Sequence, residues 1–314
     1  MMNAFEIKEK TDAIRRGIET VIVGKENEIA LVITALISNG HVLLEDAPGT
    51  GKTTLAKALA RSFSVNYKRV QFTPDLLPSD LTGINVYSPK TGEFTFRKGS
   101  LFTNILLADE INRATPRTQS GLLESMEEKQ ITVDGDTYVL PPPYFVIATQ
   151  NPIETHGTFP LPEAQMDRFL MRLALGYPDT EQVITRFIRN DPLTQLNPSC
   201  SSAELIALQA AVKDIRIHED IIRYIGRITE DTRRSDAVIL GVSPRGSLHL
   251  ARACQSWAAL HGRDFVIPSD VKQLAPHVLP HRLILRGSGE KTNRSVKIIE
   301  DILSSAPAPT EDLF

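Results

Sequence analysis

Short apolar runs alternate with helical hydrophobic patterns over the first half of the chain. Turn-bounded apolar runs predict buried strands at residues 41–45, 67–72, 104–108, 143–149 and 170–174. Helical spacing of apolar residues predicts helices at residues 3–20, 26–39, 53–63, 116–128 and 179–190. Strands that alternate with helices are typical of a parallel sheet with helices on both faces. The pattern therefore predicts an α/β domain over residues 1–178, which ends at the Tyr177-Pro178-Asp179 break.

Two predicted hairpins interrupt this alternation. The first covers residues 84–97 and turns at residues 90–92, and the second covers residues 131–140 and turns at Asp134-Gly135. An Asp-Gly pair between strand-like segments is a strong signal for a hairpin turn. We interpret both hairpins as insertions into the α/β domain that serve contacts rather than stability.

Beyond residue 202 the hydrophobic pattern is that of helices alone. Helical spacing recurs at residues 202–213, 219–234, 244–261 and 269–279, and no strand is predicted between them. We therefore predict a linker helix and loop at residues 179–202, followed by a smaller all-helical domain at residues 203–306. The Pro-containing end, residues 307–314, is predicted to be disordered.

Composition and charge exclude several classes of protein. A chain of 314 residues is long enough for two domains with cores of their own. Lys and Arg number 35 and Asp and Glu 38, and this net charge of −3 argues against a broad binding surface for duplex DNA or anionic lipid. Cys200 and Cys254 stand in distant segments and make neither a disulfide framework nor a zinc site. Because no apolar stretch approaches the roughly 18 residues of a membrane span and the start lacks a signal-peptide core, we expect a cytoplasmic protein.

A phosphate-binding loop is the strongest chemical signal in the sequence. The segment 46–53, Asp-Ala-Pro-Gly-Thr-Gly-Lys-Thr, lies between a predicted strand and a predicted helix, as such a loop requires. Gly49 and Gly51 let backbone N–H groups turn toward phosphate oxygens, and the helix presents its positive end to the same anions. Lys52 would reach the β- and γ-phosphates of a nucleotide, and the Thr53 hydroxyl would bind Mg²⁺. The nucleotide-binding residues predicted here are Pro48, Gly49, Thr50, Gly51, Lys52, Thr53 and Thr54.

The first position of this loop departs from the generic pattern. The pattern begins with Gly, whereas this chain has Asp46. Because Asp tolerates a left-handed backbone better than most residues do, we expect the loop to form with Asp46 at this position.

Two carboxylates follow the apolar run that ends at Ala108. A strand in the middle of a sheet has no structural need for adjacent acids at its tip, and Asp109-Glu110 stands there. Given the phosphate-binding loop, Asp109 is predicted to hold the Mg²⁺ shell, and Glu110 to orient and activate the attacking water. Another apolar run ends at Asn151, which is predicted to lie beside Asp109 and to contact both the γ-phosphate and the water.

Two arginines complete the candidate site. Arg168 follows a short polar segment at the surface of the predicted core. Arg245 opens a predicted helix, directly after Pro244, which favours the first turn. A cation at that end of a helix opposes the helix dipole, and an anionic ligand would remove the mismatch.

The sequence resembles the MoxR family of AAA+ ATPases over about residues 10–305. Beyond the phosphate-binding loop, the resemblance rests on five motifs, which lie at residues 72–80, 107–114, 148–152, 157–169 and 243–245. It implies an AAA+ core with hairpin inserts, a helical lid domain and an insert at residues 73–98. It further implies that Val23 and Gly24 lie against the adenine of ATP, that Arg168 reaches the nucleotide of a neighbouring subunit, and that Arg245 acts within its own subunit. A homo-oligomeric ring, expected to be a hexamer, and a separate partner chain with a von Willebrand factor A domain are implied as well.

The resemblance favours one function among four. The first is Mg²⁺-dependent ATP hydrolysis that remodels or activates a partner protein. The alternative is the ATPase subunit of a chelatase-like complex that inserts a metal, which a single sequence separates poorly from the first. A nucleic-acid motor is disfavoured by the net charge of −3 and the single Trp. A scaffold that binds ATP without turnover is disfavoured by the presence of Glu110 and Arg168.

Overall fold

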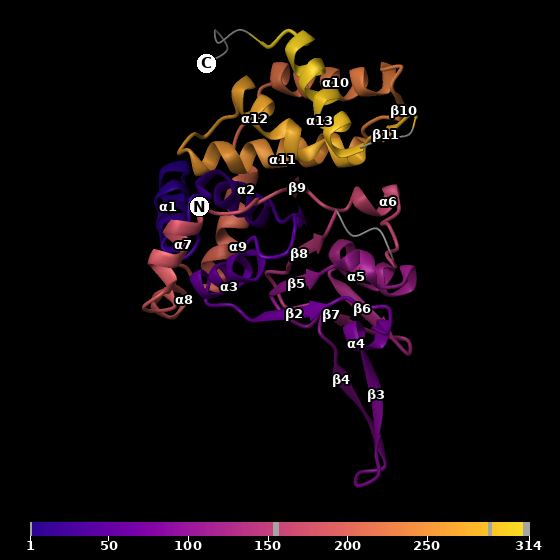
Figure 1. The fold of residues 1–314 in the computed structure, drawn as a ribbon. Coiled ribbons are helices and arrows are strands. Elements are labelled where there is room, and N and C mark those ends of the chain that lie inside the picture. The colour runs from indigo at the N-terminus through magenta and orange to yellow at the C-terminus, as the bar shows by residue number, and fades with distance from the viewer. Residues whose placement is uncertain (1, 153–156, 288–290, 310–314) are drawn as a thin grey trace.

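A five-stranded parallel sheet forms the centre of the molecule in the computed structural model, which describes residues 2–152, 157–287 and 291–309 (Figure 1). The strand order across the sheet is β2-β5-β8-β1-β9, and every neighbouring pair is parallel. The strands are β1 (Val42–Glu45), β2 (Tyr67–Gln71), β5 (Ile105–Asp109), β8 (Phe145–Gln150) and β9 (Met171–Leu173). These strands match the five predicted runs, and the α/β core is confirmed.

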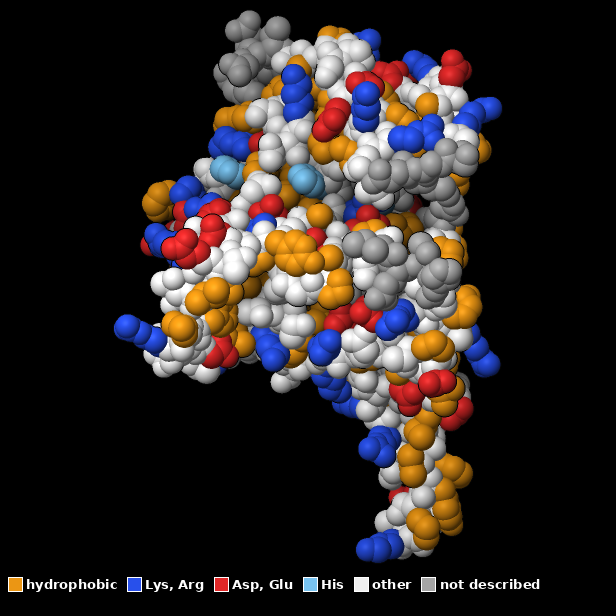
Figure 2. Space-filling view, in the orientation of Figure 1, with side chains coloured by type: hydrophobic (Ala, Val, Ile, Leu, Met, Phe, Trp, Pro, Cys, Tyr) orange, Lys and Arg blue, Asp and Glu red, His pale blue; other side chains and the backbone are white. Residues whose placement is uncertain are grey.

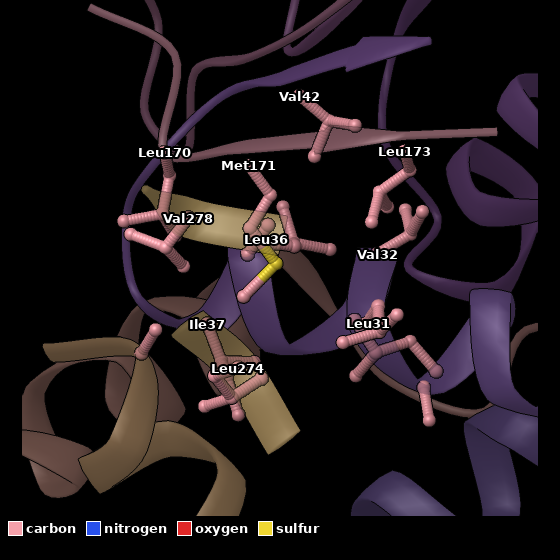
Figure 3. Packing of buried hydrophobic residues seen from close by; sticks show 14 of the residues in the cluster. Leu31, Val32, Leu36, Ile37, Val42, Leu170, Met171, Leu173, Leu274 and Val278 are labelled. Atoms are coloured by element: carbon pink, nitrogen blue, oxygen red, sulfur yellow. The ribbon is translucent and has the colours of Figure 1, made fainter. Parts of the chain in front are cut away.

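Both faces of the sheet are buried, which explains why its strands are continuous apolar runs. Val42 and Leu44 pack with the helices α1 (Ala4–Glu19), α2 (Glu26–Ile37) and α3 (Lys52–Ser62). The intervening Leu43 belongs to a second cluster on the other face, with side chains of α5 (Pro116–Glu128). Figure 3 shows α2 in the first cluster, where Leu36 lies among strand residues and Ile37 lies beside Leu274.

A helical domain packs against the first face through α2. It consists of α9 (Ser202–Ala211), α10 (Glu219–Arg234), α11 (Pro244–Leu260), α12 (Pro268–Val278) and α13 (Lys291–Ser305). The sequence predicted four of these helices and missed α13, although Ile299 and Leu303 are buried on it one turn apart.

Two short strands correct the prediction of an all-helical domain. β10 (Val238–Leu240) and β11 (Ile284–Leu285) form an antiparallel pair beside the helices. Strands of three and two residues are too short to show an alternating pattern, so the hydrophobic pattern does not predict them.

Both predicted hairpins are present and contact each other. The pair β3 (Gly83–Ser88) and β4 (Glu93–Lys98) follows α4 (Pro78–Thr82) and projects away from the body (Figures 1 and 2), and its exposed side chains include Tyr87 and Phe94. The second pair is β6 (Gln130–Val133) and β7 (Asp136–Val139). The Phe96 ring of the first hairpin stacks on the Tyr138 ring of the second, with 3.9 Å between centroids.

Short helices connect the sheet to the helical domain. α6 (Glu163–Met166) precedes β9, and α7 (Thr180–Phe187) and α8 (Pro192–Gln195) follow it. The helix predicted at residues 179–190 is thus shorter than expected, and a second helix begins at Pro192. Most of the predicted disordered tail, residues 310–314, lies outside the described residues. Within the described part of the chain, no helix is long and apolar enough to cross a membrane.

Candidate active site

The phosphate-binding loop joins β1 to α3 in a left-handed backbone at two glycines. Gly49 has a φ of +87° and Gly51 one of +90°, and a Cβ at either position would meet no atom within 4 Å. Glycine is therefore needed here for backbone conformation rather than for space. Lys52 Nζ donates to the carbonyl oxygens of Asp46, at 3.0 Å, and Ala47, at 3.3 Å. The ammonium group is thus held over the loop where phosphate oxygens would lie.

Asp46 does not use the left-handed backbone that Asp tolerates. It is not among the residues with positive φ. Its buried carboxylate instead accepts backbone N–H bonds from Leu175, at 2.6 Å, and Gly176, at 2.9 Å. These bonds tie the phosphate-binding loop to the segment that follows β9, which a loop with Gly at this position could not do.

The carboxyl ends of β5 and β8 bring three predicted polar residues to one edge of the sheet. Asp109 and Asn151 are buried, and Glu110 is partly buried in a left-handed backbone with a φ of +55°. Thr149 connects the two acids, because its hydroxyl donates to Asp109 Oδ1 at 2.6 Å and accepts from the Glu110 backbone N–H at 2.8 Å. The Asp109 carboxylate and the Glu110 backbone are therefore both held next to the strand that leads to Asn151.

Two residues on β2 contact the acids and were missed by the sequence analysis. Arg69 donates to Asp109 Oδ2 from Nε, at 3.1 Å, and from Nη2, at 2.6 Å. Gln71 Nε2 donates to Glu110 Oε2 at 2.8 Å, and Arg113 Nη1 donates to the same oxygen at 3.1 Å. The strand register that pairs Gln71 with Asp109 places these side chains there. The sequence feature that could have indicated them is the presence of Arg69 and Gln71 near the end of the strand predicted at residues 67–72.

An apolar pocket lies beside the phosphate-binding loop. It has a volume of about 240 Å³, and it is lined by residues from three segments: Val21, Ile22, Val23 and Lys25 after α1; Gly49, Thr50, Gly51 and Thr54 around the start of α3; and Pro178, Val183 and Phe187 at α7. Aliphatic and aromatic walls next to a phosphate loop suit a purine base. Val23 is therefore where an adenine contact was expected; Gly24, its neighbour, is not among the lining residues.

The two arginines lie at the opposite end of the sheet from the phosphate-binding loop. Arg168 stands just before β9, and the next-but-one residue, Leu170, donates its backbone N–H to the carbonyl of His41 at the start of β1. Arg245 forms an ion pair with Glu127 at 2.8 Å, and the carbonyl of the preceding Met126 contacts the His41 ring. Because the loop follows the far end of β1, the structure does not bring Arg245 to the loop of its own chain, contrary to expectation.

Asp167 ties the segment of Arg168 to that of Arg245. Its carboxylate accepts from the Ser243 hydroxyl at 3.0 Å and pairs with Arg282 Nε at 2.9 Å. Burial lowers the pKa of Arg282 to about 10, which still leaves the guanidinium charged at neutral pH. The segments that carry the two arginines thus lie together on one side of the molecule.

The fold and this edge of the sheet define a P-loop ATPase of the AAA class with a lid domain. A family model for ATPases associated with various cellular activities (AAA) matches residues 41–171, and a model for the AAA lid domain matches residues 230–302. Among characterised relatives, the chaperone MoxR1 of Mycobacterium tuberculosis is 40% identical over 85% of this chain and 74% of its own. The protein MoxR of Methylorubrum extorquens is 30% identical over 94% of both chains. The chain belongs to the MoxR family of AAA+ ATPases.

Two further matches cover nearly the whole chain. The uncharacterised protein YeaC of Bacillus subtilis is 48% identical over 94% of this chain and 93% of its own. A crystal structure of a protein from Cytophaga hutchinsonii superposes with a TM-score of 0.89 at 34% identity, and it covers 98% of this chain and 97% of that one. The fold, with its sheet and its lid, is therefore shared with this solved structure over nearly its whole length.

Proposed function

We propose that this protein hydrolyses ATP with Mg²⁺ and uses the hydrolysis to remodel or activate a partner protein. The observation that carries the proposal is the pair of acidic residues at the end of β5, at the sheet edge where Lys52 also lies. Thr149 holds the Asp109 carboxylate and the Glu110 backbone beside the strand of Asn151. Members of the AAA class bind nucleotide, and the residues present suit ATP and Mg²⁺. The loop glycines and Lys52 fit the phosphates, the apolar pocket fits the base, and Thr53 and Asp109 would hold the metal.

Each residue near the phosphates has a separate task in this proposal. Lys52 would leave its carbonyl partners and neutralise phosphate oxygens. Glu110 would take the proton of the attacking water, and Asn151 would hold that water toward the phosphate. Mg²⁺, when bound, would offset the charge on the phosphate oxygens.

Arg168 and Arg245 are proposed to act on the nucleotide of a neighbouring copy. Their position away from their own loop, and the Asp167 link between their segments, support a shared site in a ring, which we propose to be hexameric. An arginine of this kind stabilises charge on the phosphoryl group and can contribute about 10³–10⁵ in rate. We further propose a cytoplasmic location and a von Willebrand factor A domain protein as the partner.

The test separates nucleotide binding from hydrolysis. Lys52→Ala is expected to lose ATP binding, whereas Glu110→Gln is expected to keep it and to lose turnover by about 10²–10⁴, because only the base is removed. Phosphate release and equilibrium binding of a fluorescent ATP analogue measure the two. Hydrolysis by Glu110→Gln at the wild-type rate would remove Glu110 from its role. Copurification with the Glu110→Gln variant in ATP would identify the partner, and a tetrapyrrole-binding partner would favour the chelatase alternative.

A further inference from the structure

A groove outside the nucleotide site runs between the helical domain and the end of α2. It has a volume of about 720 Å³, and its lining includes Ile222, Leu248 and Arg252. Ile222 is 56% exposed and Leu248 48%, so the apolar floor is open to water. Among the described residues that line it, Lys213 and Arg252 are the charged ones, so the groove is apolar and positively charged.

The helix α7 carries an apolar stripe that its own chain leaves uncovered. None of its residues is buried, and Ile184 is 56% exposed and Ile188, at its C-terminal end, 73%. Glu181 lies on the same side as these isoleucines, because positions i, i+3 and i+7 of a helix share one face. Arg186 points elsewhere and donates to the carbonyl of Glu19. The stripe is therefore apolar with one negative charge, which complements the groove in both respects.

The two surfaces lie at positions that suit a head-to-tail contact. Leu248 and Arg252 follow Arg245 on α11 by three and seven residues, so all three lie on one face of the helix. The groove is thus continuous with the side of the molecule that presents Arg245. α7 flanks the base pocket, and Figure 1 shows it on the opposite side of the core from α6, the element next to Arg168.

We propose that α7 of one copy lies in the groove of the next copy. Ile184 and Ile188 would cover the apolar floor at Ile222 and Leu248, and Glu181 would meet Lys213 or Arg252. The inference rests on the proposed function, because the same contact would bring Arg245 of one copy toward the nucleotide of its neighbour. An interface between two different surfaces of identical chains repeats, and it closes into a ring when the rotation permits.

Disulfide formation tests the contact directly. The double variant Ile188→Cys, Leu248→Cys is treated with oxidised glutathione, which is reduced as the two thiols lose electrons and protons to form the S–S bond. A ladder of covalent multimers that disappears with dithiothreitol is expected. The natural Cys200 and Cys254 are buried and stay in place. The control is Ile188→Cys, Ile239→Cys, because Ile239 is 63% exposed and is not among the groove residues. A ladder from neither pair, or an equal ladder from both, would overturn the proposal.

Charge substitution gives a second measurement that does not depend on cysteine chemistry. Ile188→Glu and Leu248→Glu are each expected to shift the protein to monomers in sedimentation velocity and to lower ATP hydrolysis per chain at least tenfold. Nucleotide affinity should stay within twofold of the wild type, and Ile239→Glu should alter none of these values. A full ring from Ile188→Glu or Leu248→Glu would contradict the contact.

The outcomes distinguish this inference from the proposed function. If the Ile188→Cys, Leu248→Cys variant forms the specific ladder but the wild-type protein releases no phosphate, the proposed hydrolysis is refuted and the contact stands. A protein that hydrolyses ATP as a ring but gives no specific ladder refutes the contact alone. Recovery of a client peptide, instead of a second copy, bound in the groove also refutes it.

Discussion

Asp46 accepts a 2.9 Å hydrogen bond from the backbone N–H of Gly176, so the first residue of the phosphate-binding loop is bonded to the segment that leads into α7. That segment continues to Pro178, Val183 and Phe187, which form one wall of the base pocket. The carboxylate therefore sets the distance between the part of the site that would hold phosphates and the part that would hold the base.

Asp46→Ala is expected to weaken ADP binding by about tenfold or more. The change leaves one buried and one partly buried N–H group without this acceptor. A buried N–H group left without an acceptor costs about 1–3 kcal/mol, and we expect part of that cost to weaken binding by displacing the base pocket. Asp46→Asn should lose less, because it keeps one acceptor oxygen. Isothermal titration calorimetry measures the affinities, and Asp75→Ala, at an exposed loop residue, is the control. Wild-type affinity in Asp46→Ala would show that the bond plays no part in binding.

Arg69→Gln is expected to lower the Mg²⁺ concentration that gives half-maximal ATP hydrolysis. The guanidinium pairs with Asp109 at 2.6 Å and competes with a metal for that carboxylate. Because Arg69 is about half exposed, the pair is worth only about 0–1 kcal/mol, so the shift should be about two- to fivefold. Magnesium titrations of phosphate release measure it, with Lys68→Gln on the same strand as the control. An unchanged or higher magnesium requirement in Arg69→Gln would contradict the competition.

Mixing two inactive variants tests whether the site is shared between copies. Arg168→Ala should bind ATP normally and turn over about 10³-fold or more slowly, and Lys52→Ala should bind none. A mixture should recover part of the activity, since some interfaces then pair an intact loop with an intact arginine. The same result is expected for Arg245→Ala mixed with Lys52→Ala, because Arg245 lies away from its own loop. Native mass spectrometry of tagged chains first confirms exchange; mixed rings without activity would exclude the shared site.

His41 makes the stability of the core depend on pH. Its buried ring accepts from the Val146 backbone N–H at 3.0 Å, and burial lowers its pKa from 6.5 to about 4. Between pH 6.5 and 4, His41 is therefore protonated in the unfolded chain but mostly neutral in the folded chain. The free energy of unfolding falls as the pH falls through that window. The loss from this group by pH 4 is on the order of 3 kcal/mol.

Urea unfolding at pH 7 and pH 4.5 measures this loss. His41→Gln is expected to be less stable at pH 7 but to lose less stability on acidification, because its amide does not titrate. His218→Gln, at an exposed histidine, should keep the wild-type pH dependence. An equal loss in His41→Gln and the wild type would mean that other groups cause it.

Local patterns predicted the core well because the strands and the phosphate-binding loop can each be recognised from a few consecutive residues. The run at β5 followed by Asp109-Glu110 needs no knowledge of distant segments, and the strand neighbours β5 and β8 followed from the class of fold. The contacts of Arg69 and Gln71 with the two acids were not predicted, because they depend on the register of β2 against β5. The position of Arg245 was not predicted correctly for a related reason. It is set by how α11 packs on α1 and α2, which no local pattern encodes.

The stacked rings of Phe96 and Tyr138 join the β3–β4 and β6–β7 hairpins into one projecting unit, here called the arm. A lone two-stranded hairpin is marginally stable in water, and the stack, together with the 2.8 Å bond from Asn85 to Asp134, braces the base of the longer one. The chain leaves β4 toward β5 and leaves β7 toward β8, whose far ends bear the acids and Asn151. The exposed arm is therefore joined along the chain to the two strands whose carboxyl ends carry Asp109, Glu110 and Asn151.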